Sequence, residues 1–171
     1  GVQGSCPGTF FKENFGSNTS CISIENNHTL LILDSGTGIR YLSEKTDFDK
    51  FKDVILLITH SHWDHIQGFP FFRYIYQNKK LTIYSHLKKH TDFLINQING
   101  TNFPVNKEDL LCQFEIINDL NKINQMIDFK IKTIPTNHHG NCVGYRVEFK
   151  NCDLTYIPDN QLHNTTTTNY E

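Results

Sequence analysis

A group of potential metal-binding side chains directly follows a short apolar segment near residue 60. Residues 54–58 are apolar and mostly branched, which predicts a buried strand. Three histidines and one aspartate lie within the next six residues after position 59, in the order H-x-H-x-D-H. Imidazole and carboxylate groups are the usual protein ligands of zinc and related divalent ions, and α/β proteins place ligands at strand ends. The pattern therefore predicts a metal site formed by His60, His62, Asp64 and His65.

The spacing of these four residues favours two neighbouring metal positions. In an extended segment, side chains two residues apart point to the same side, so His60 and His62 can converge on one ion. Asp64 and His65 fall where we expect the chain to turn into a helix, and they can reach an adjacent position. Two ions about 3.5–4 Å apart form a clamp for hydrolysis, with a bridging hydroxide as nucleophile. We assign Asp64 the further catalytic role of orienting that hydroxide.

The H-x-H-x-D-H motif resembles that of the metallo-β-lactamase superfamily, where it supplies ligands to two metal positions. Residues 16–21 (GSNTSC) and 33–40 (LDSGTGIR) look like the G-G-N-T-S-C and L-D-A-G-T-G-I-R signatures of its phosphodiesterase branch, near ribonuclease Z and the cyclic-phosphate phosphodiesterases. Gln3 and Ser17 stand where that branch usually has arginine and glycine. The resemblance implies that Asp34 orients a ligand histidine from beneath the site.

The same resemblance implies two further ligands in the second half of the chain. A ligand histidine of ribonuclease Z-like sequences stands six or seven positions before a Gly-Tyr pair, which here is residues 144–145. His138 has that spacing, and His139 is the alternative. Residues 156–159 resemble the family's Y-x-x-D, whose aspartate bridges both metals, so the resemblance gives this role to Asp159.

One element of the resembled family is not matched. The family places another histidine well after the bridging aspartate, whereas this chain has only His163, four residues after Asp159. We therefore expect residues 1–171 to form a single metallo-β-lactamase-like domain that is incomplete at both ends.

The distribution of apolar residues predicts strands, then helices, then strands again. This pattern alone favours an α/β or α+β fold. The resemblance implies an αββα sandwich of two facing sheets covered by helices, here without some C-terminal strands. We expect Thr59 to brace the turn after its strand, and Trp63 to cover the site or to pack beneath it, with core packing favoured. The expected strands cover residues 20–25, 29–33, 54–58, 81–85, 113–117, 129–134, 144–149 and 154–157, and the expected helices cover 39–45, 65–77 and 87–98.

Composition restricts the expected partners and compartment. The formal net charge of −2 gives no basic footprint of the kind that tight nucleic-acid binding needs. No apolar run approaches the ~20 residues of a membrane span, so we expect no membrane partner. The five cysteines form no C-x-x-C pair, which favours free thiols in a cytoplasmic protein.

The leading hypothesis is a metal-dependent hydrolase that cleaves phosphodiester bonds. The near-neutral charge favours a cyclic nucleotide or another small cyclic phosphate over an RNA end, which stays open as a substrate. We expect two divalent ions, with zinc favoured and manganese or iron as alternatives. A thioester or lactam hydrolase of the same fold remains an alternative, as does an inactive metal- or nucleotide-binding module. A homodimer also stays open.

Overall fold

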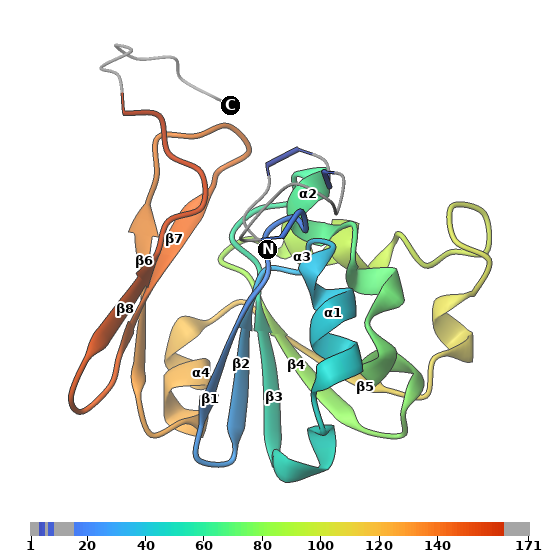
Figure 1. Ribbon diagram of the computed structural model, residues 1–171, viewed down its shortest axis with the longest axis horizontal. Coiled ribbons are helices and arrows are strands. Elements are labelled where there is room, and N and C mark those ends of the chain that lie inside the picture. The colour runs from blue at the N-terminus through green and yellow to red at the C-terminus, as the bar shows by residue number, and fades with distance from the viewer. Residues whose placement is uncertain (1–3, 6, 9–15, 163–171) are drawn as a thin grey trace.

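Two β-sheets lie face to face, and helices cover the other face of the larger sheet (Figure 1). The structure, a computed structural model, describes residues 4–5, 7–8 and 16–162. The strands are β1 (Ile22–Asn26), β2 (Thr29–Leu33), β3 (Asp53–Leu57), β4 (Lys80–Tyr84), β5 (Gln113–Ile117), β6 (Lys130–Pro135), β7 (Val143–Glu148) and β8 (Asp153–Tyr156). The α-helices are α1 (Gly38–Lys45), α2 (Trp63–Ile66), α3 (Lys88–Ile95) and α4 (Leu120–Met126), and short 3-10 helices cover Phe48–Lys50, Phe69–Phe71, Arg73–Tyr76 and Lys107–Asp109.

The larger sheet has the strand order β1-β2-β3-β4-β5. β1 pairs antiparallel with β2 through a turn at Asn27, whose φ of +49° is a left-handed conformation that asparagine tolerates. β2 to β5 run parallel. Along β2 and β3 every apolar side chain is buried, and successive residues enter cores on opposite faces: Leu30 and Leu56 face the helices, whereas Leu31 and Ile55 face the small sheet. This two-sided burial explains why both strands are continuous apolar runs.

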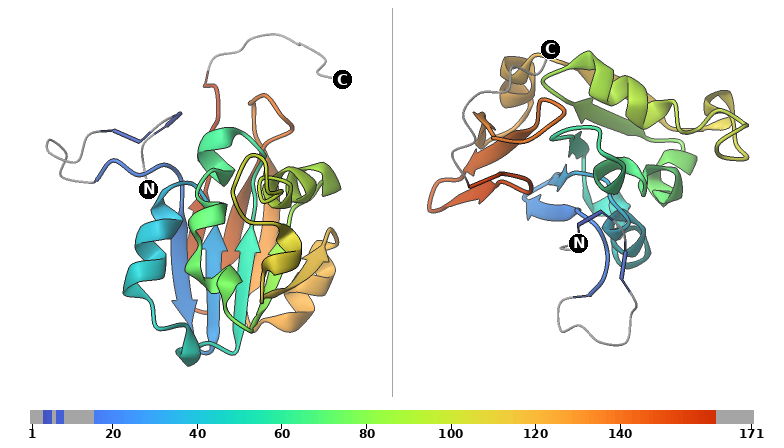
Figure 2. Two further views of the ribbon diagram at one scale, coloured as in Figure 1. Left: turned by 90° about the vertical axis from the view of Figure 1, so that its right-hand side faces the viewer. Right: turned by 90° about the horizontal axis from the view of Figure 1, so that it is seen from above.

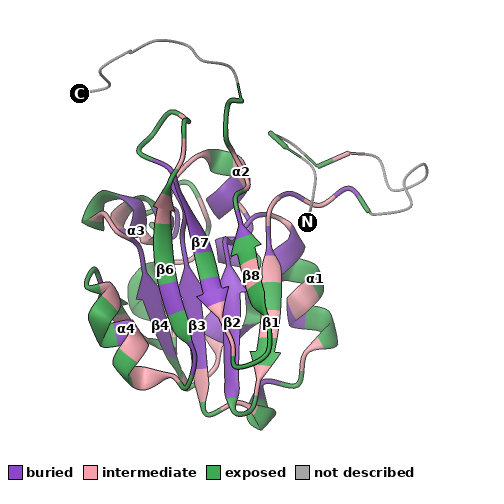
Figure 3. Cartoon of the chain, turned by 90° about the vertical axis from the view of Figure 1, so that its left-hand side faces the viewer, coloured by how far each residue is buried: buried purple, intermediate pink, exposed green. Residues whose placement is uncertain are grey.

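The smaller sheet consists of β6, β7 and β8, all antiparallel to their neighbours. Tyr145 and Val147 of β7 and Ile131 of β6 are buried in the core between the sheets. The other face carries exposed residues, and no helix among the described residues lies over it (Figure 3). Seen from above, the small sheet lies on one side of the larger sheet and α1, α2 and α3 lie on the other (Figure 2). α4 lies on the side of the small sheet, where its Ile123 joins the core between the sheets.

All eight expected strands are present, with ends that differ from the expected ones by no more than two residues. The helix expected over residues 65–77 is wrong. The chain instead forms α2, ending at Ile66, and then two 3-10 helices separated by Phe72, which is extended. Pro70 lacks an amide hydrogen, so it cannot donate the hydrogen bond to the residue four positions earlier that a continuous α-helix needs, and this explains the interruption. α4 was not expected because it is short and polar; of its residues only Ile123 is buried.

Two side chains near the histidine motif differ in how well they were predicted. Thr59 is fully buried and hydrogen-bonded at the end of its strand, as expected. Trp63 was expected in the core, but its side chain is 61% exposed at the start of α2. Since Trp63 stands between two residues that point into the site, the helix turns its indole outward.

The described cysteines carry free thiols: Cys21, Cys112, Cys142 and Cys152. Cys6 lies outside the described residues. Over the part of the chain that the structure describes, every helix is too short or too polar to cross a membrane. The cytoplasmic location stays a prediction.

Candidate metal centre

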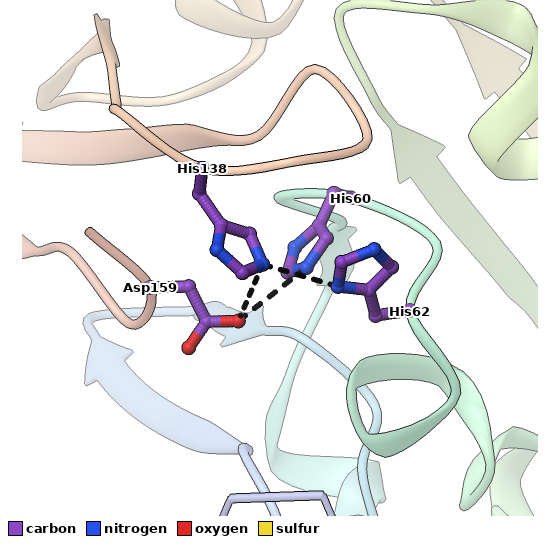
Figure 4. A group of neighbouring side chains, drawn as sticks. All are labelled: His60, His62, His138 and Asp159. Atoms are coloured by element: carbon purple, nitrogen blue, oxygen red, sulfur yellow. Dashed lines mark hydrogen bonds and ion pairs between the residues drawn. The ribbon is translucent and has the colours of Figure 1, made fainter. Parts of the chain in front are cut away.

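Three histidines and an aspartate from three different loops converge at one end of the two sheets (Figure 4). His60 and His62 follow β3, His138 lies between β6 and β7, and Asp159 follows β8. One nitrogen or oxygen atom from each residue lies within 4.8 Å of the corresponding atom of every other. His138 Nε2 is 3.1 Å from His62 Nδ1, and Asp159 Oδ2 is 3.4 Å from His60 Nε2. These atoms face one another as ligands around one ion do.

Asp159 also faces a second group of side chains. Its Oδ2 atom lies 3.2 Å from His65 Nε2, which in turn lies 3.7 Å from Asp64 Oδ2. The backbone N–H of Ser5 donates a hydrogen bond of 2.8 Å to the same Asp64 oxygen. One carboxylate oxygen of Asp159 therefore stands between the histidine cluster and the Asp64–His65 pair, which is where a bridging ligand would stand.

The buried carboxylate of Asp34 holds the base of this site together. Asp34 directly follows β2, is fully buried, and has a φ of +61°. It accepts hydrogen bonds from the Thr59 backbone N–H at 2.8 Å, from Thr59 Oγ1 at 2.9 Å and from Tyr156 Oη at 2.9 Å. Its Oδ2 atom also lies 2.7 Å from His65 Nδ1. An ionised carboxylate only accepts, so His65 Nδ1 carries the proton and His65 Nε2 presents a lone pair to the site.

The same reasoning sets the orientation of His60. The Thr59 hydroxyl has one proton, which it donates to Asp34, so its oxygen accepts from His60 Nδ1 at 3.1 Å. His60 Nε2 then presents a lone pair. Both His60 Nε2 and His65 Nε2 are buried and have no hydrogen-bond partner among the described residues. Buried polar nitrogens are normally satisfied, so two orphaned lone pairs beside Asp159 fit a divalent cation.

Two glycines allow the loop after β2 to press against α2. A Cβ atom on Gly36 would lie 2.3 Å from the Asp64 carbonyl oxygen, and one on Gly68 would lie 2.1 Å from the Gly36 carbonyl oxygen. Backbone hydrogen bonds from Ser35 N–H to the His65 carbonyl and from Gly68 N–H to the Ser35 carbonyl join the segments. This close packing at Gly36 and Gly68 fixes the backbone that carries Asp64 and His65.

A third glycine brings the loop between β6 and β7 against the histidines. Gly140 has a φ of +80°, and a Cβ atom there would lie 3.3 Å from His62 Nε2 and 3.6 Å from His60 Cδ2. This conformation is open to glycine and strained for other residues. The loop can therefore place His138 directly beside the other two histidines.

Burial and repulsion between imidazoles lower the pKa of His60 and of His138. Burial, followed by the neighbouring imidazoles of which His65 is the first, lowers the pKa of His60 to about 2. Burial also lowers the pKa of His138, although Asp159 opposes it. At His65 burial acts in the same downward direction, but its hydrogen bond to Asp34 and the charge of that carboxylate outweigh it and raise the pKa. His60 and His138 are therefore neutral at pH 7, the form that binds metal.

The chain also matches a known protein family. A sequence model of the metallo-β-lactamase superfamily matches residues 15–148. The chain belongs to the metallo-β-lactamase superfamily. Its structure is similar to that of the metallo-β-lactamase fold protein YhfI from Bacillus subtilis, with 18% sequence identity and a TM-score of 0.62. It is also similar to a diphosphatase from the PhnP family, with 16% identity and a TM-score of 0.52. No curated protein matches the chain.

These structural likenesses confirm the expected fold. The YhfI match covers 91% of this chain and 58% of YhfI, and the diphosphatase match covers 75% of this chain and 49% of that protein. The chain thus spans roughly half of the solved structures that it matches. Most metallo-β-lactamase superfamily members are metal-dependent hydrolases, and this chain has a His/Asp group that can bind a metal. The specific resemblance to the phosphodiesterase branch stays a prediction.

The structure brings together the residues that the sequence suggested as ligands of a superfamily site. Four form the compact group and two adjoin it: His60, His62, His138 and Asp159, then Asp64 and His65. The alternative residue His139 lies outside the group, with its ring centre 6.0 Å from that of His138. His163 lies outside the described residues. The roles of the six residues as ligands remain a proposal.

Sequence reasoning missed two supports of the site. Tyr156 was noted only as part of a motif, and its hydrogen bond to Asp34 was not foreseen. Gly140 was not singled out, although a glycine directly after the His-His pair is the available signal for a tight turn.

Proposed function

We propose that this protein is a metal-dependent hydrolase that cleaves phosphodiester bonds in a cyclic nucleotide or another small cyclic phosphate. The observation that carries the proposal is the position of Asp159 Oδ2, which faces the histidine cluster on one side and His65 on the other. Such an arrangement suits a pair of ions that share one carboxylate. The phosphodiesterase-like segments at residues 16–21 and 33–40 favour this bond class over thioesters and lactams.

The ligand set divides between two ions. His60, His62 and His138 would hold the first, Asp64 and His65 the second, and Asp159 both. Zinc is the ion we favour for imidazole and carboxylate ligands, with manganese or iron as alternatives. When bound, the pair supplies Lewis acidity at the phosphoryl oxygen and activates water near neutral pH.

The protein's own groups would orient the reactants. Asp64 Oδ2 accepts one hydrogen bond from the Ser5 N–H, so its carboxylate has lone pairs left to accept a proton of the attacking water. Asp34 and Thr59 keep the lone pairs of His65 and His60 directed into the site. The net charge of −2 favours a small substrate over a long nucleic acid. The neighbour described as a diphosphatase is consistent with a phosphorus-containing substrate.

Hydrolysis assays with three substrate classes test this proposal. Metal-free protein would be reconstituted with zinc or manganese and assayed on bis(p-nitrophenyl) phosphate, a thioester and a chromogenic lactam. We expect metal-dependent hydrolysis of the phosphodiester, which His62→Ala lowers by roughly a hundredfold or more because a ligand of the ion is lost. His28→Ala is the matched control, since His28 is exposed in the turn before β2, at the opposite end of that strand from the site.

Each other outcome has a definite meaning. Hydrolysis of only the thioester or the lactam would replace the phosphodiester assignment with one of those activities. Metal uptake without hydrolysis of any substrate would favour a binding module. Equal activity of folded His62→Ala and the unaltered protein would contradict the site.

A further inference from the structure

A histidine outside the metal cluster contacts the loop that carries two of its members. His90 lies on α3 and is only 1% exposed. Its Nδ1 atom lies 3.0 Å from Oγ of Ser61, the residue between His60 and His62 in the chain. Ser61 is partly exposed. The contact therefore ties the loop after β3 to the helix beside it.

The same histidine faces the loop that carries His138. The backbone carbonyl of Asn141 lies close enough to favour the protonated forms of both His90 and His86. The ring centres of His86 and His90 are 5.3 Å apart. Asn141 follows Gly140 and has a φ of +56°, so it belongs to the tight turn that presses against the cluster. His90 thus lies where α3 meets both ligand-carrying loops.

The hydrogen-bond roles of His90 follow from these neighbours. Burial, followed by the nearby His86, lowers the pKa of His90 to about 4, so its ring is neutral near pH 7 and has one donor and one acceptor nitrogen. Ser61 Oγ lies 3.0 Å from Nδ1, whereas Nε2 is buried and has no hydrogen-bond partner among the described residues. The neutral ring and the hydroxyl can each donate or accept, so one hydrogen bond joins Ser61 Oγ and His90 Nδ1.

We propose that Ser61 and His90 are a positioning pair that holds the His60–His62 loop in place against α3 and the His138 loop, and thereby sets the affinity of the cluster for its ion. This inference rests on the proposed metal site and extends it to residues that do not face the ion. The two side chains act through the backbone of the loops. Residues that orient metal ligands typically change metal affinity by about 10–100-fold when they are lost.

A cobalt titration measures this role directly. Metal-free protein would be titrated with Co²⁺, and both the dissociation constant and the d–d absorption band would be recorded for Ser61→Ala, His90→Phe and the double variant. We expect each single change to weaken binding by roughly tenfold or more and to alter the band. The double variant should be no weaker than the weaker single one, because both changes remove the same hydrogen bond. His90→Asn keeps a polar group where Nδ1 lies and should restore most of the affinity.

A neighbouring residue of α3 provides the control. Thr91 is fully buried, and its hydroxyl donates to the Lys88 carbonyl of the same helix. Thr91→Val should bind cobalt like the unaltered protein; a loss as large as that of His90→Phe would indicate a loosened helix and overturn the proposal. Should His90→Phe fail to fold, Ser61→Ala carries the test, because Ser61 is partly exposed and the change is small.

The outcomes separate this inference from the proposed function. If the unaltered protein binds cobalt and the folded Ser61→Ala and His90→Phe variants bind it equally well, only the positioning pair is refuted. Losses that add in the double variant would likewise refute the pair, because the residues would then act independently. If the unaltered protein takes up no cobalt, the proposed metal site fails and the pair fails with it.

Discussion

The phenol oxygen of Tyr156 lies 2.9 Å from Oδ2 of Asp34, although the two residues are 122 positions apart in the chain. Tyr156 ends β8 of the small sheet and Asp34 follows β2 of the large one. Burial, with the negative charge of Asp34, raises the pKa of Tyr156, so its hydroxyl stays a donor. This hydrogen bond joins the two sheets at the carboxylate that orients His65. The metal site therefore depends on the packing of one sheet on the other.

Tyr156→Phe should weaken metal binding while leaving the ring packing intact. The change removes one of the donors that fix Asp34, and we expect about a tenfold loss of zinc affinity, with a loss of unfolding free energy of about 1–2 kcal/mol. A zinc competition titration and urea unfolding measure the two effects. Tyr145→Phe is the matched control, because the Tyr145 hydroxyl donates to the Ile58 carbonyl rather than to Asp34. Equal zinc affinity in both variants and the unaltered protein would contradict this role.

Gly140→Ala should weaken zinc binding by the histidine cluster, because the new methyl group would contact His62 and the backbone there is strained for alanine. The added methyl group would lie 3.3 Å from His62 Nε2, at a φ of +80° that alanine rarely adopts. Gly16→Ala introduces a similar strain at a φ of +75° with no atom within 4 Å of the new methyl group. We expect both variants to lose some stability and only Gly140→Ala to lose zinc affinity. The same zinc titration distinguishes them, and unchanged affinity in Gly140→Ala would show that the loop can move away.

The metal-free protein should lose stability as the pH falls below about 6.5, the usual pKa of histidine. Burial lowers the pKa of His60 to about 2 in the folded state, so at pH 5 the unfolded chain binds a proton that the folded one does not. Proton uptake by the unfolded state lowers stability as pH decreases, by about 2 kcal/mol at pH 5 for this one group.

His60→Asn isolates this effect because asparagine does not titrate. Urea unfolding of the metal-free variant between pH 7.5 and pH 5 should show a loss smaller by about 2 kcal/mol than that of the unaltered protein. An identical loss in both proteins would mean that His60 is protonated normally in the fold.

The features that sequence reasoning predicted are those that short stretches of chain determine. β2 and β3 are buried on both faces, so their apolar runs identify them directly. His60, His62, Asp64 and His65 lie within one loop and the start of α2, so their spacing alone suggests a shared site. The prediction of His138 and Asp159 as ligands required the family resemblance, because no local sequence pattern relates them to His60.

The features that were missed depend on the packing of distant segments. The contacts of Tyr156 with Asp34 and of His90 with Ser61 join residues from different elements, and neither pair has a spacing that marks it. Core packing was the favoured expectation for Trp63, yet its place between ligand residues turns it outward. The long helix expected after residue 65 disregarded Pro70, whose missing amide hydrogen interrupts the α-helical hydrogen bonds.

The most direct test of the account is the zinc content of the folded protein and of two carboxylate variants. Metal-free protein, Asp64→Asn and Asp159→Asn would each be titrated with zinc and analysed for bound metal. Because Asp159 Oδ2 faces both groups of side chains, the account predicts about two zinc ions in the unaltered protein, weaker binding of mainly one ion in Asp64→Asn, and weaker binding of both in Asp159→Asn. A folded protein that takes up no zinc, manganese or iron, or an Asp159→Asn variant that binds two ions as tightly as the unaltered protein, would contradict it.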